Sequence, residues 1–274
     1  MTRVCVVTGG GSGMGLEAAK ILGKERIVVI SGRTEKKLEK AVEQLKALGC
    51  EAYYKTCDTS NRESVKELVD YACTLGEITN VINSAGLSPA MSDAETILKV
   101  NALGTVYVNE EFSKVMKQGS VIVDVASNSA YILPSFLINK KLYKYADTDE
   151  QTFLTKLLKK CKIAKEGYPR NGIAYSYSKN FVVWYAQKCA YEYGPKGIRV
   201  VSLSPGLIAT DMGNLEKGEG GVLIPFTAEN RMGKPEELGF ALASVADERN
   251  GYLAGVDILC DGGSVNGKQF KKTK

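Results

Sequence analysis

The sequence predicts one α/β domain over residues 1–274, with a doubly wound, mainly parallel sheet and helices on both faces. The 274 residues are 44% apolar and 24% charged, which suits one large domain with a substantial core. Short β-branched runs alternate with longer amphipathic stretches along the chain. A glycine-rich segment at 8–15 lies between the first of these runs and the first helical pattern, as at the first turn of such a sheet.

Each expected strand is a short run rich in valine, isoleucine or other strand-forming residues. We expect strands at 3–8, 27–31, 51–56, 80–84, 120–126, 199–204 and 257–260. Between these runs, apolar residues recur at intervals of three and four, which predicts helices near 14–24, 34–48, 61–75, 92–116, 175–193 and 235–247. Right-handed crossovers between successive parallel strands would place these helices on both faces of the sheet.

One segment departs from this alternation. The 47 residues between Ser127 and Tyr175 contain no strand-like run after position 133. An acidic stretch at 147–150 resembles a helix N-terminus, and apolar residues at helical spacing follow it as far as Cys161, among five lysines. The segment 167–172 is expected to end this helix. Because a structureless loop of this length is rare in a compact domain, we predict a helical insertion at about 131–172.

Composition excludes several classes of function. The net charge of +5 comes largely from dispersed lysines that solvate a surface, so we expect no nucleic-acid partner. The seven cysteines show no CxxC spacing, and histidine is absent, so we expect reduced thiols, no metal site and no Ser-His-Asp catalysis. No apolar run approaches the roughly 20 residues of a membrane span. The first strand begins almost at Met1, which leaves no room for a signal peptide, so we expect a cytoplasmic protein without a membrane partner.

The glycine loop has the features of a dinucleotide-binding turn. Gly9 would permit the tight turn, Gly13 would let the chain approach a phosphate, and Gly15 would allow close packing of helix on strand. Ser12 and Met14 lie in the same loop, where backbone amides at a helix N-terminus can bind an anion. The alternative is a glycine-rich turn without a ligand.

The end of the second expected strand indicates which dinucleotide binds. An NAD site usually places a carboxylate there, and the 2′-phosphate of NADP requires a cation. The sequence offers Arg33 and no carboxylate at 31–34, which favours NADP. NAD stays possible, because Arg33 can also be a solvated surface residue and Ser12 supplies no second cation.

Tyr175 and Lys179 are four residues apart, which places both side chains on one face of a helix. With the glycine loop, this pair predicts a nicotinamide-dependent oxidoreductase. Nine motifs in order then make the chain resemble the short-chain dehydrogenase/reductase family. They are TGGGSGMG at 8–15, CDT at 57–59, NSAG at 83–86, KVNA at 99–102, VDVAS at 123–127, YSYSK at 175–179, SPGLIATDM at 204–212, RMGKPEE at 231–237 and GVDILCDGG at 255–263. A serine stands at 84, where the family usually has asparagine.

The resemblance implies a Rossmann-type fold and a catalytic tetrad of Asn101, Ser127, Tyr175 and Lys179. Tyr175 would be the general acid in reduction or the base in oxidation, and Lys179 would lower the pKa of its phenol from the ordinary value near 10. Ser127 would bind the substrate oxygen. Asn101 would hold a water that connects Lys179 to solvent, although it can also simply bond to the backbone.

Two neighbouring residues compete for these roles. Tyr177 would point to a different face of the helix from Lys179, which favours Tyr175. Ser129 competes with Ser127, which directly follows an apolar strand, where a doubly wound sheet presents ligand-binding groups.

The resemblance also implies further cofactor contacts. Asp58 would bind the adenine with Thr59 beside it, Asn83, Ala85 and Gly86 would lie along the ribose, and Pro205, Gly206, Ile208 and Thr210 would hold the carboxamide. The glycine-rich segment at about 207–232 carries scattered apolar side chains, which suits a mobile lid over a lipophilic substrate.

Two spacings resemble the bacterial 3α-hydroxysteroid dehydrogenase/carbonyl reductase subgroup: the short segment from Gly86 to Asn101 and the long one from Ser127 to Tyr175. This resemblance implies a secondary alcohol–ketone interconversion on a hydroxysteroid or bile acid. It also implies a homo-oligomer, with a dimer favoured, because the insertion covers a helix face that most relatives use for assembly. The alternatives are a general carbonyl reductase of small ketones, aldehydes or quinones and, more remotely, a non-catalytic nucleotide-sensing regulator.

Overall fold

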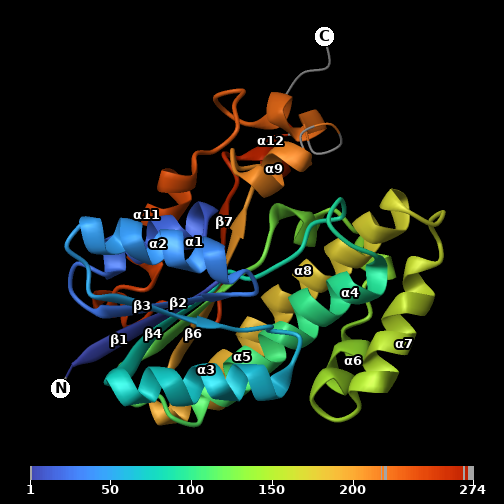
Figure 1. The fold of residues 1–274 in the computed structure, drawn as a ribbon. Helices are drawn as coiled ribbons and strands as arrows, with labels where there is room; N and C mark the ends of the chain where they lie inside the picture. Colours follow the sequence, from blue (N-terminus) through green and yellow to red (C-terminus); the bar gives the residue numbers. More distant parts are fainter. Residues whose placement is uncertain (1, 217, 219–220, 268, 271–274) are drawn as a thin grey trace.

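The computed structural model describes residues 2–267 except 217, 219 and 220, together with residues 269 and 270. One seven-stranded sheet has the order β3-β2-β1-β4-β5-β6-β7, and every pairing in it is parallel. Its strands are β1 (Arg3–Thr8), β2 (Ile27–Gly32), β3 (Ala52–Thr56), β4 (Glu77–Asn83), β5 (Val121–Val125), β6 (Arg199–Pro205) and β7 (Asp257–Cys260). The predicted doubly wound sheet is confirmed, and all seven strands lie where the β-branched runs predicted them (Figure 1).

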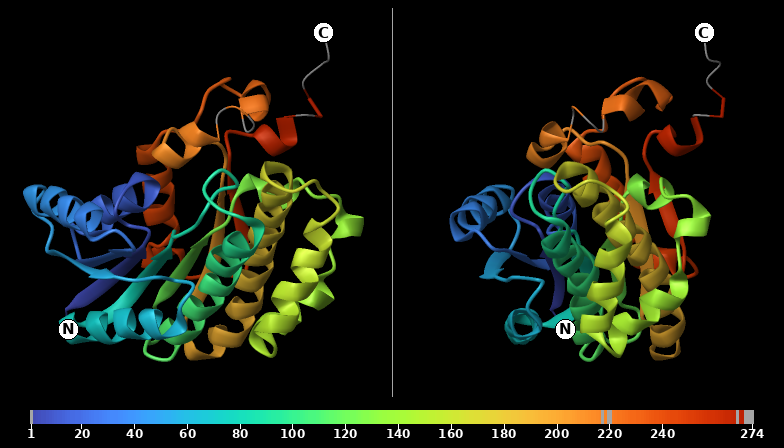
Figure 2. Two further views of the ribbon diagram at one scale, coloured as in Figure 1. Left: turned by 45° about the vertical axis from the view of Figure 1, so that its right-hand side comes forward. Right: turned by 90° about the vertical axis from the view of Figure 1, so that its right-hand side faces the viewer.

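Both faces of the sheet are covered, which explains why the strands are continuously apolar. In β1, Val4 and Val6 join one buried cluster and Cys5 and Val7 join the other, because successive side chains alternate between faces. One layer holds α1 (Gly13–Leu22), α2 (Glu35–Ala47) and α11 (Pro235–Val245), and the opposite layer holds α3 (Arg62–Leu75), α5 (Gly104–Ser113) and α8 (Tyr168–Tyr193) (Figure 2).

The helix predicted over 92–116 contains a change of helical type. It begins as α4 (Ala94–Leu98), continues as a π-helical turn at Lys99–Leu103, and ends as α5. Such π turns are rare and are frequently found at functional sites. Asn101 lies in the middle of this turn, so the irregularity controls where its side chain points.

The helical insertion is confirmed, but its end is corrected. It consists of short 3₁₀ turns at Asn128–Tyr131, Ser135–Leu137 and Lys144–Asp147, with α6 (Lys140–Tyr143) and α7 (Glu150–Cys161). The segment 167–172, expected to end a helix, instead begins α8 at Tyr168, seven residues before the predicted start. Pro169 is tolerated there because a proline in the first helical turn lacks only an N–H that has no partner within the helix.

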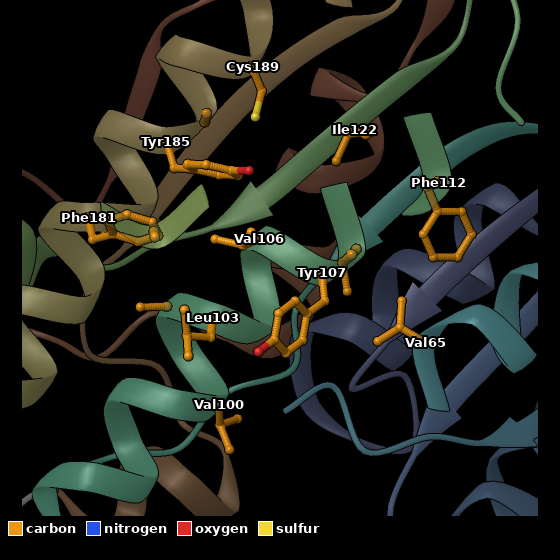
Figure 3. Close-up of a cluster of buried hydrophobic side chains, with 14 of the residues drawn as sticks. Val65, Val100, Leu103, Val106, Tyr107, Phe112, Ile122, Phe181, Tyr185 and Cys189 are labelled. Atoms are coloured by element: carbon orange, nitrogen blue, oxygen red, sulfur yellow. The ribbon is translucent and has the colours of Figure 1, made fainter. Parts of the chain in front are cut away.

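Aromatic side chains fix the insertion to α8. Phe153 of α7 packs against Phe181 with ring centroids 5.0 Å apart, and Tyr143 of α6 lies 5.3 Å from the same ring. Tyr185, one turn further along α8, stacks on Phe181 at 5.3 Å. Figure 3 shows Phe181 and Tyr185 on α8 facing Leu103 and Val106 within this core. The insertion is therefore part of one core with α4, α5 and α8.

The C-terminal elements lie above the carboxyl ends of the strands. They are α9 (Asp211–Leu215), a 3₁₀ segment at Gly221–Phe226 and α12 (Ser264–Gly267), drawn in orange and red at the top of Figure 1. Within the described residues, no helix has both the length and the apolar character that crossing a membrane requires.

Candidate active site

A cavity of about 390 Å³ opens at the carboxyl ends of β5 and β6. Its described lining brings together nine of the predicted site residues: Met14, Gly86, Ser127, Tyr175, Lys179, Pro205, Gly206, Ile208 and Thr210. The lid residues predicted at 207–232 contribute Met212 of α9 and Val222 and Leu223 of the following 3₁₀ segment. Three of the four predicted catalytic residues thus surround one space with residues of the predicted lid, and Asn101 is not part of the described lining.

Tyr175 and Lys179 both face this cavity from α8. Burial raises the pKa of the Tyr175 phenol, the hydrogen bond with Ser127 lowers it, and the charge of Glu216 raises it again. Burial dominates, so the net direction is upward, and the expected lowering by Lys179 together with the charge of the oxidised nicotinamide stays a prediction. At neutral pH the phenol is therefore a proton donor.

Lys179 is 5% exposed, and its Nζ donates a hydrogen bond to the backbone oxygen of Val125 at 2.8 Å. Burial lowers the pKa of its ammonium to about 8, against the opposing charge of Asp124. The fully buried Asp124 accepts hydrogen bonds from the Nδ2 atoms of Asn83 (2.9 Å) and Asn109 (2.8 Å). Burial raises the pKa of Asp124 to about 6, and these two bonds oppose the rise. A buried carboxylate therefore lies close to the lysine of the candidate site.

Asn101 uses its side chain to fix the loop that follows β4. Its Nδ2 donates to the backbone oxygen of Leu87 at 2.9 Å and to Ser178 Oγ at 3.2 Å, and its Oδ1 accepts from the Leu87 N–H at 2.8 Å. A Cβ placed on Gly86 would lie 3.2 Å from Asn101 Oδ1 and 3.5 Å from Lys179 Nζ, so these groups converge on one point. Asn101 therefore bonds the backbone of the loop after β4 and not that of its own helix, and the water-holding role stays a prediction.

Ser127 and Ser129 both line the cavity, but their hydroxyls differ. Ser127 caps the 3₁₀ turn after β5, where its Oγ accepts from the Ser129 N–H at 3.2 Å, and it contacts Tyr175. The Ser129 Oγ is buried and has no hydrogen-bond partner among the described residues. This difference favours Ser127. Tyr177 is likewise excluded, because its Oη donates to the backbone oxygen of Leu137 in the insertion.

The glycine loop has the conformation that an anion site needs. Gly9 and Gly13 have φ of 66° and 57°, in the left-handed region that favours glycine. A Cβ on Gly9 would lie 2.9 Å from the Ala85 backbone, and one on Gly15 would lie 2.5 Å from Ser84 Oγ. Ser12 precedes α1 without a side-chain cap bond, which leaves the first backbone N–H groups of the helix free for a phosphate. These residues fit a dinucleotide.

The remaining predicted cofactor residues lie along the same edge, outside the cavity. Asn83 and Ala85 connect the end of β4 to the end of β1. Asn83 accepts a hydrogen bond from Thr8 Oγ1 at 2.9 Å, and the Ala85 N–H donates to the same Oγ1 at 3.1 Å. Asp58 accepts from the Ser60 N–H and hydroxyl within its own turn. Thr59 packs against Gly104, whose added Cβ would lie 3.1 Å from it.

Arg33 is exposed directly after β2, and no carboxylate pairs with it among the residues described. Ser12 of the glycine loop supplies no second cation, but α2 brings one close to the loop. A Cβ on Gly11 of the glycine loop would lie 3.7 Å from Lys37 Cβ, so the first turn of α2 brings Lys37 beside the loop. Both side chains carry positive charge at the edge where a 2′-phosphate would lie.

Sequence reasoning missed three further residues of this region. Gly10 packs so tightly that an added Cβ would lie 2.8 Å from Ile30 Cγ2. Asp124 was part of a motif but had no assigned role, and Glu216 lines the cavity from the C-terminus of α9. The unusual aspartate within an apolar strand was the one available signal. No group of three metal-binding side chains occurs in the described part of the chain.

Comparisons with known proteins agree with this geometry. The family model described as short chain dehydrogenase matches residues 3–136, and the one described as Enoyl-(Acyl carrier protein) reductase matches residues 161–265. A short-chain dehydrogenase/reductase of Alternaria brassicicola is 28% identical, with 97% of each chain covered. A cyclohexanol dehydrogenase of an Acinetobacter species is 26% identical (95% of this chain, 94% of that one), and a 3beta-hydroxysteroid dehydrogenase of Eggerthella lenta is 25% identical with the same coverage.

Two solved structures share the fold. A dehydrogenase/reductase from Sinorhizobium meliloti superposes with a TM-score of 0.77 at 21% identity, and 96% of each chain is covered. A short chain dehydrogenase from Burkholderia cenocepacia, in complex with NADP, superposes with a TM-score of 0.75 at 22% identity, covering 95% of this chain and 96% of that one.

Proposed function

This chain belongs to the short-chain dehydrogenase/reductase family of oxidoreductases, and from that premise we propose that it interconverts a secondary alcohol and a ketone with NADP(H). The observation that carries the proposal is the contact of Tyr175 with Ser127 in a largely apolar cavity, with the Lys179 ammonium beside them. A proton donor, a hydrogen-bonding hydroxyl and a positive charge at one point are what reduction of a carbonyl requires.

Each residue has a definite task in this reaction. Ser127 holds the carbonyl oxygen, which fixes the reacting carbon within the cavity. Tyr175 donates its phenolic proton to that oxygen during reduction and takes it back during oxidation. Lys179 stabilises the phenolate that remains, because its ammonium lies near the ring, with Nζ 5.8 Å from the centroid. NADP(H), when bound, supplies or accepts the hydride.

The raised pKa of Tyr175 determines how the rates of reduction and oxidation should depend on pH. A phenol that stays protonated at neutral pH is ready to act as an acid, which favours ketone reduction. Alcohol oxidation needs the phenolate and should accelerate as the pH rises towards the pKa of the tyrosine. We therefore expect the rate of alcohol oxidation to rise with pH from pH 7 upwards.

NADP is the proposed cofactor because Arg33 and Lys37 carry positive charge beside the glycine loop, and no carboxylate occupies residues 31–34. The solved relative from Burkholderia cenocepacia, which has the same fold, is described in complex with NADP. NAD remains the alternative cofactor. A wild-type preference for NAD, or an NADP preference that Arg33→Ala leaves unchanged, would contradict this choice.

The proposed substrate is a hydroxysteroid or bile acid. The cavity lining is mostly apolar, and one relative over almost the full length is a 3beta-hydroxysteroid dehydrogenase. The cyclohexanol dehydrogenase relative, slightly more similar, supports a small cyclic alcohol or ketone as the second candidate. A non-catalytic regulator is disfavoured because Tyr175, Lys179 and Ser127 converge on one cavity.

The test is a panel of oxosteroids, hydroxysteroids and small cyclic ketones, each assayed in both directions with NADP and NAD. We expect NADP-linked turnover of at least one steroid, lost in Tyr175→Phe but retained in Tyr177→Phe, whose hydroxyl points into the insertion. Turnover of cyclohexanone without any steroid turnover would select the second candidate. Full activity in Tyr175→Phe would overturn the mechanism.

The proposed assembly is a homodimer. Because α7 buries Phe153, Leu154 and Leu157 against the α4 and α8 side of the domain, this face is already covered within one chain. A partner subunit must therefore use another surface. Sedimentation equilibrium of the full chain measures the mass directly, and a tetramer would contradict the assignment.

A further inference from the structure

Among the described residues that line the cavity, only Lys179 and Glu216 carry a charge. The Lys179 ammonium is engaged by the Val125 carbonyl, and the carboxylate of Asp124 lies behind it. Glu216, at the C-terminus of α9, has no cation paired with it within the described part of the chain. A substrate therefore meets one negative charge that none of the described cations pairs with.

Two donors hold the Glu216 carboxylate in a fixed place. Its Oε1 accepts a hydrogen bond from the Ala90 N–H at 3.0 Å, in the loop after β4. Its Oε2 accepts from the Tyr168 hydroxyl at 2.5 Å, at the first residue of α8. A carboxylate offers about four acceptor positions, so these two bonds leave capacity for a donor on a ligand. The side chain thus bridges α9 to the two segments that form the opposite wall.

The negative charge of Glu216 affects Tyr175, the proposed proton donor in the same cavity. It acts on the Tyr175 phenol and disfavours its anionic form. A carboxylated substrate that binds within this cavity of about 390 Å³ brings its carboxylate into the same space as Glu216. At separations of roughly 8 Å and an effective dielectric constant near 20, repulsion between two unit charges corresponds to about a 30-fold loss of affinity.

We propose that the negative charge of Glu216 selects the substrates of this enzyme. It favours neutral or cationic alcohols and ketones that place a hydrogen-bond donor near the Glu216 carboxylate, and it disfavours substrates that carry a carboxylate of their own. This inference rests on the proposed alcohol–ketone function of the same cavity. It narrows the substrate class from hydroxysteroids and bile acids to neutral hydroxysteroids. Free bile acids become poor substrates, while their neutral esters fit.

The test compares matched pairs that differ only in charge. An oxo bile acid and its methyl ester form the first pair, and a small oxo acid and its methyl ester form the second. Glu216→Gln removes the charge but keeps an oxygen for the Ala90 N–H. Glu166→Gln is the control, because it makes the same charge change on a side chain that is 90% exposed and outside the cavity lining.

We expect the wild-type kcat/KM to favour the ester over the acid by about tenfold or more. Glu216→Gln should bring this ratio close to one by improving turnover of the acid, and Glu166→Gln should leave it unchanged. In alcohol oxidation, Glu216→Gln should also move the rising limb of the pH–rate profile to lower pH, since the phenolate is no longer disfavoured by the carboxylate. A purely structural role would not produce that shift.

Calorimetric binding of the same pairs separates this inference from the proposed function. If the protein binds the ester in preference to the acid but turns over neither, the alcohol–ketone function fails and the Glu216 assignment stands. An equal wild-type preference for acid and ester overturns the assignment, as does a ratio that Glu216→Gln leaves unchanged. A protein that neither binds nor turns over any member of either pair overturns both.

Discussion

Replacing Lys179 by methionine should remove activity and increase stability at neutral pH. The pKa of the Lys179 ammonium falls from 10.5 to about 8 because the group is buried. Since each pKa unit corresponds to about 1.4 kcal/mol, keeping the ammonium charged in the folded protein at pH 7 costs about 3 kcal/mol. Methionine removes this cost but also loses the bond to the Val125 oxygen, which contributes about 1 kcal/mol. We expect a net gain of about 2 kcal/mol.

The stability difference between Lys179→Met and the wild type should depend on pH in a defined direction. Between pH 8 and 10.5 the folded protein has released the Lys179 proton while the unfolded chain still binds it. The unfolded state then binds more protons, so the contribution of Lys179 to stability rises with pH over that window. The advantage of Lys179→Met should therefore be largest at pH 7 and should disappear by about pH 10.

Urea unfolding followed by fluorescence measures this difference. Trp184 is the only tryptophan and lies on α8, one turn after Lys179. Both proteins are unfolded at pH 7, 8, 9 and 10 and at one protein concentration, because association would shift the apparent stability. Asp124→Asn, made in both backgrounds, corrects for the carboxylate that loses its counter-charge. A variant less stable than wild type at pH 7, or a gap that stays constant with pH, would refute the reasoning.

Two further variants test how the site is held in place. In Gly239→Ala, the new Cβ would lie 2.7 Å from the Glu17 carbonyl carbon, so α11 and α1 must separate. We expect urea unfolding to show a loss of about 1–3 kcal/mol in the free energy of unfolding. A variant as stable as the wild type would contradict this packing. Glu150→Ala removes the acceptor of the Tyr107 hydroxyl (2.6 Å) and a contact with Arg62 (3.4 Å), so we expect a loss of about 1–2 kcal/mol. Amide hydrogen exchange should accelerate mainly in α7. Glu150→Gln should have a smaller effect, because it keeps an acceptor for the Tyr107 hydroxyl. Uniform acceleration across the sheet would show that Glu150 does not stabilise α7 locally.

The strands could be predicted because their environment is uniform. A strand buried on both faces of a parallel sheet is apolar at nearly every position, as in β1, and such short β-branched runs recur along the chain. Tyr175 and Lys179 were predictable for a related reason, since a spacing of four residues fixes their shared face on any helix. Both inferences need only local geometry.

The beginning of α8 was missed because Pro169 and Gly172 disfavour a helix interior but are tolerated near its first turn. Pro169 and Gly172 interrupt a helix interior, but Pro169 lies in the first turn, and a Cβ on Gly172 would meet nothing within 4 Å. The π-helical turn around Asn101 was also missed. Helix propensities describe one residue at a time and cannot distinguish a bond to the fifth residue from one to the fourth.

The electrostatic partners were missed because tertiary structure brings them together. Asp124 and Lys179 lie 55 positions apart, and β5 and α8 become neighbours only when the sheet forms. Glu216 meets Ala90 and Tyr168 from a distant part of the chain in the same way. Sequence spacing contains no information about such contacts, so the effects of burial and of Glu216 on the pKa of Tyr175 could not be predicted.

Burial moves the two proposed catalytic groups towards their neutral forms. It raises the pKa of the Tyr175 phenol and lowers that of the Lys179 ammonium to about 8, so burial alone favours a phenol beside an amine. A neutral amine would give the phenolate no electrostatic support during turnover. The carboxylate of Asp124 opposes this tendency, and its two amide donors, Asn83 and Asn109, oppose its own protonation. The buried aspartate therefore keeps the lysine charged at the pH where the tyrosine must give up its proton.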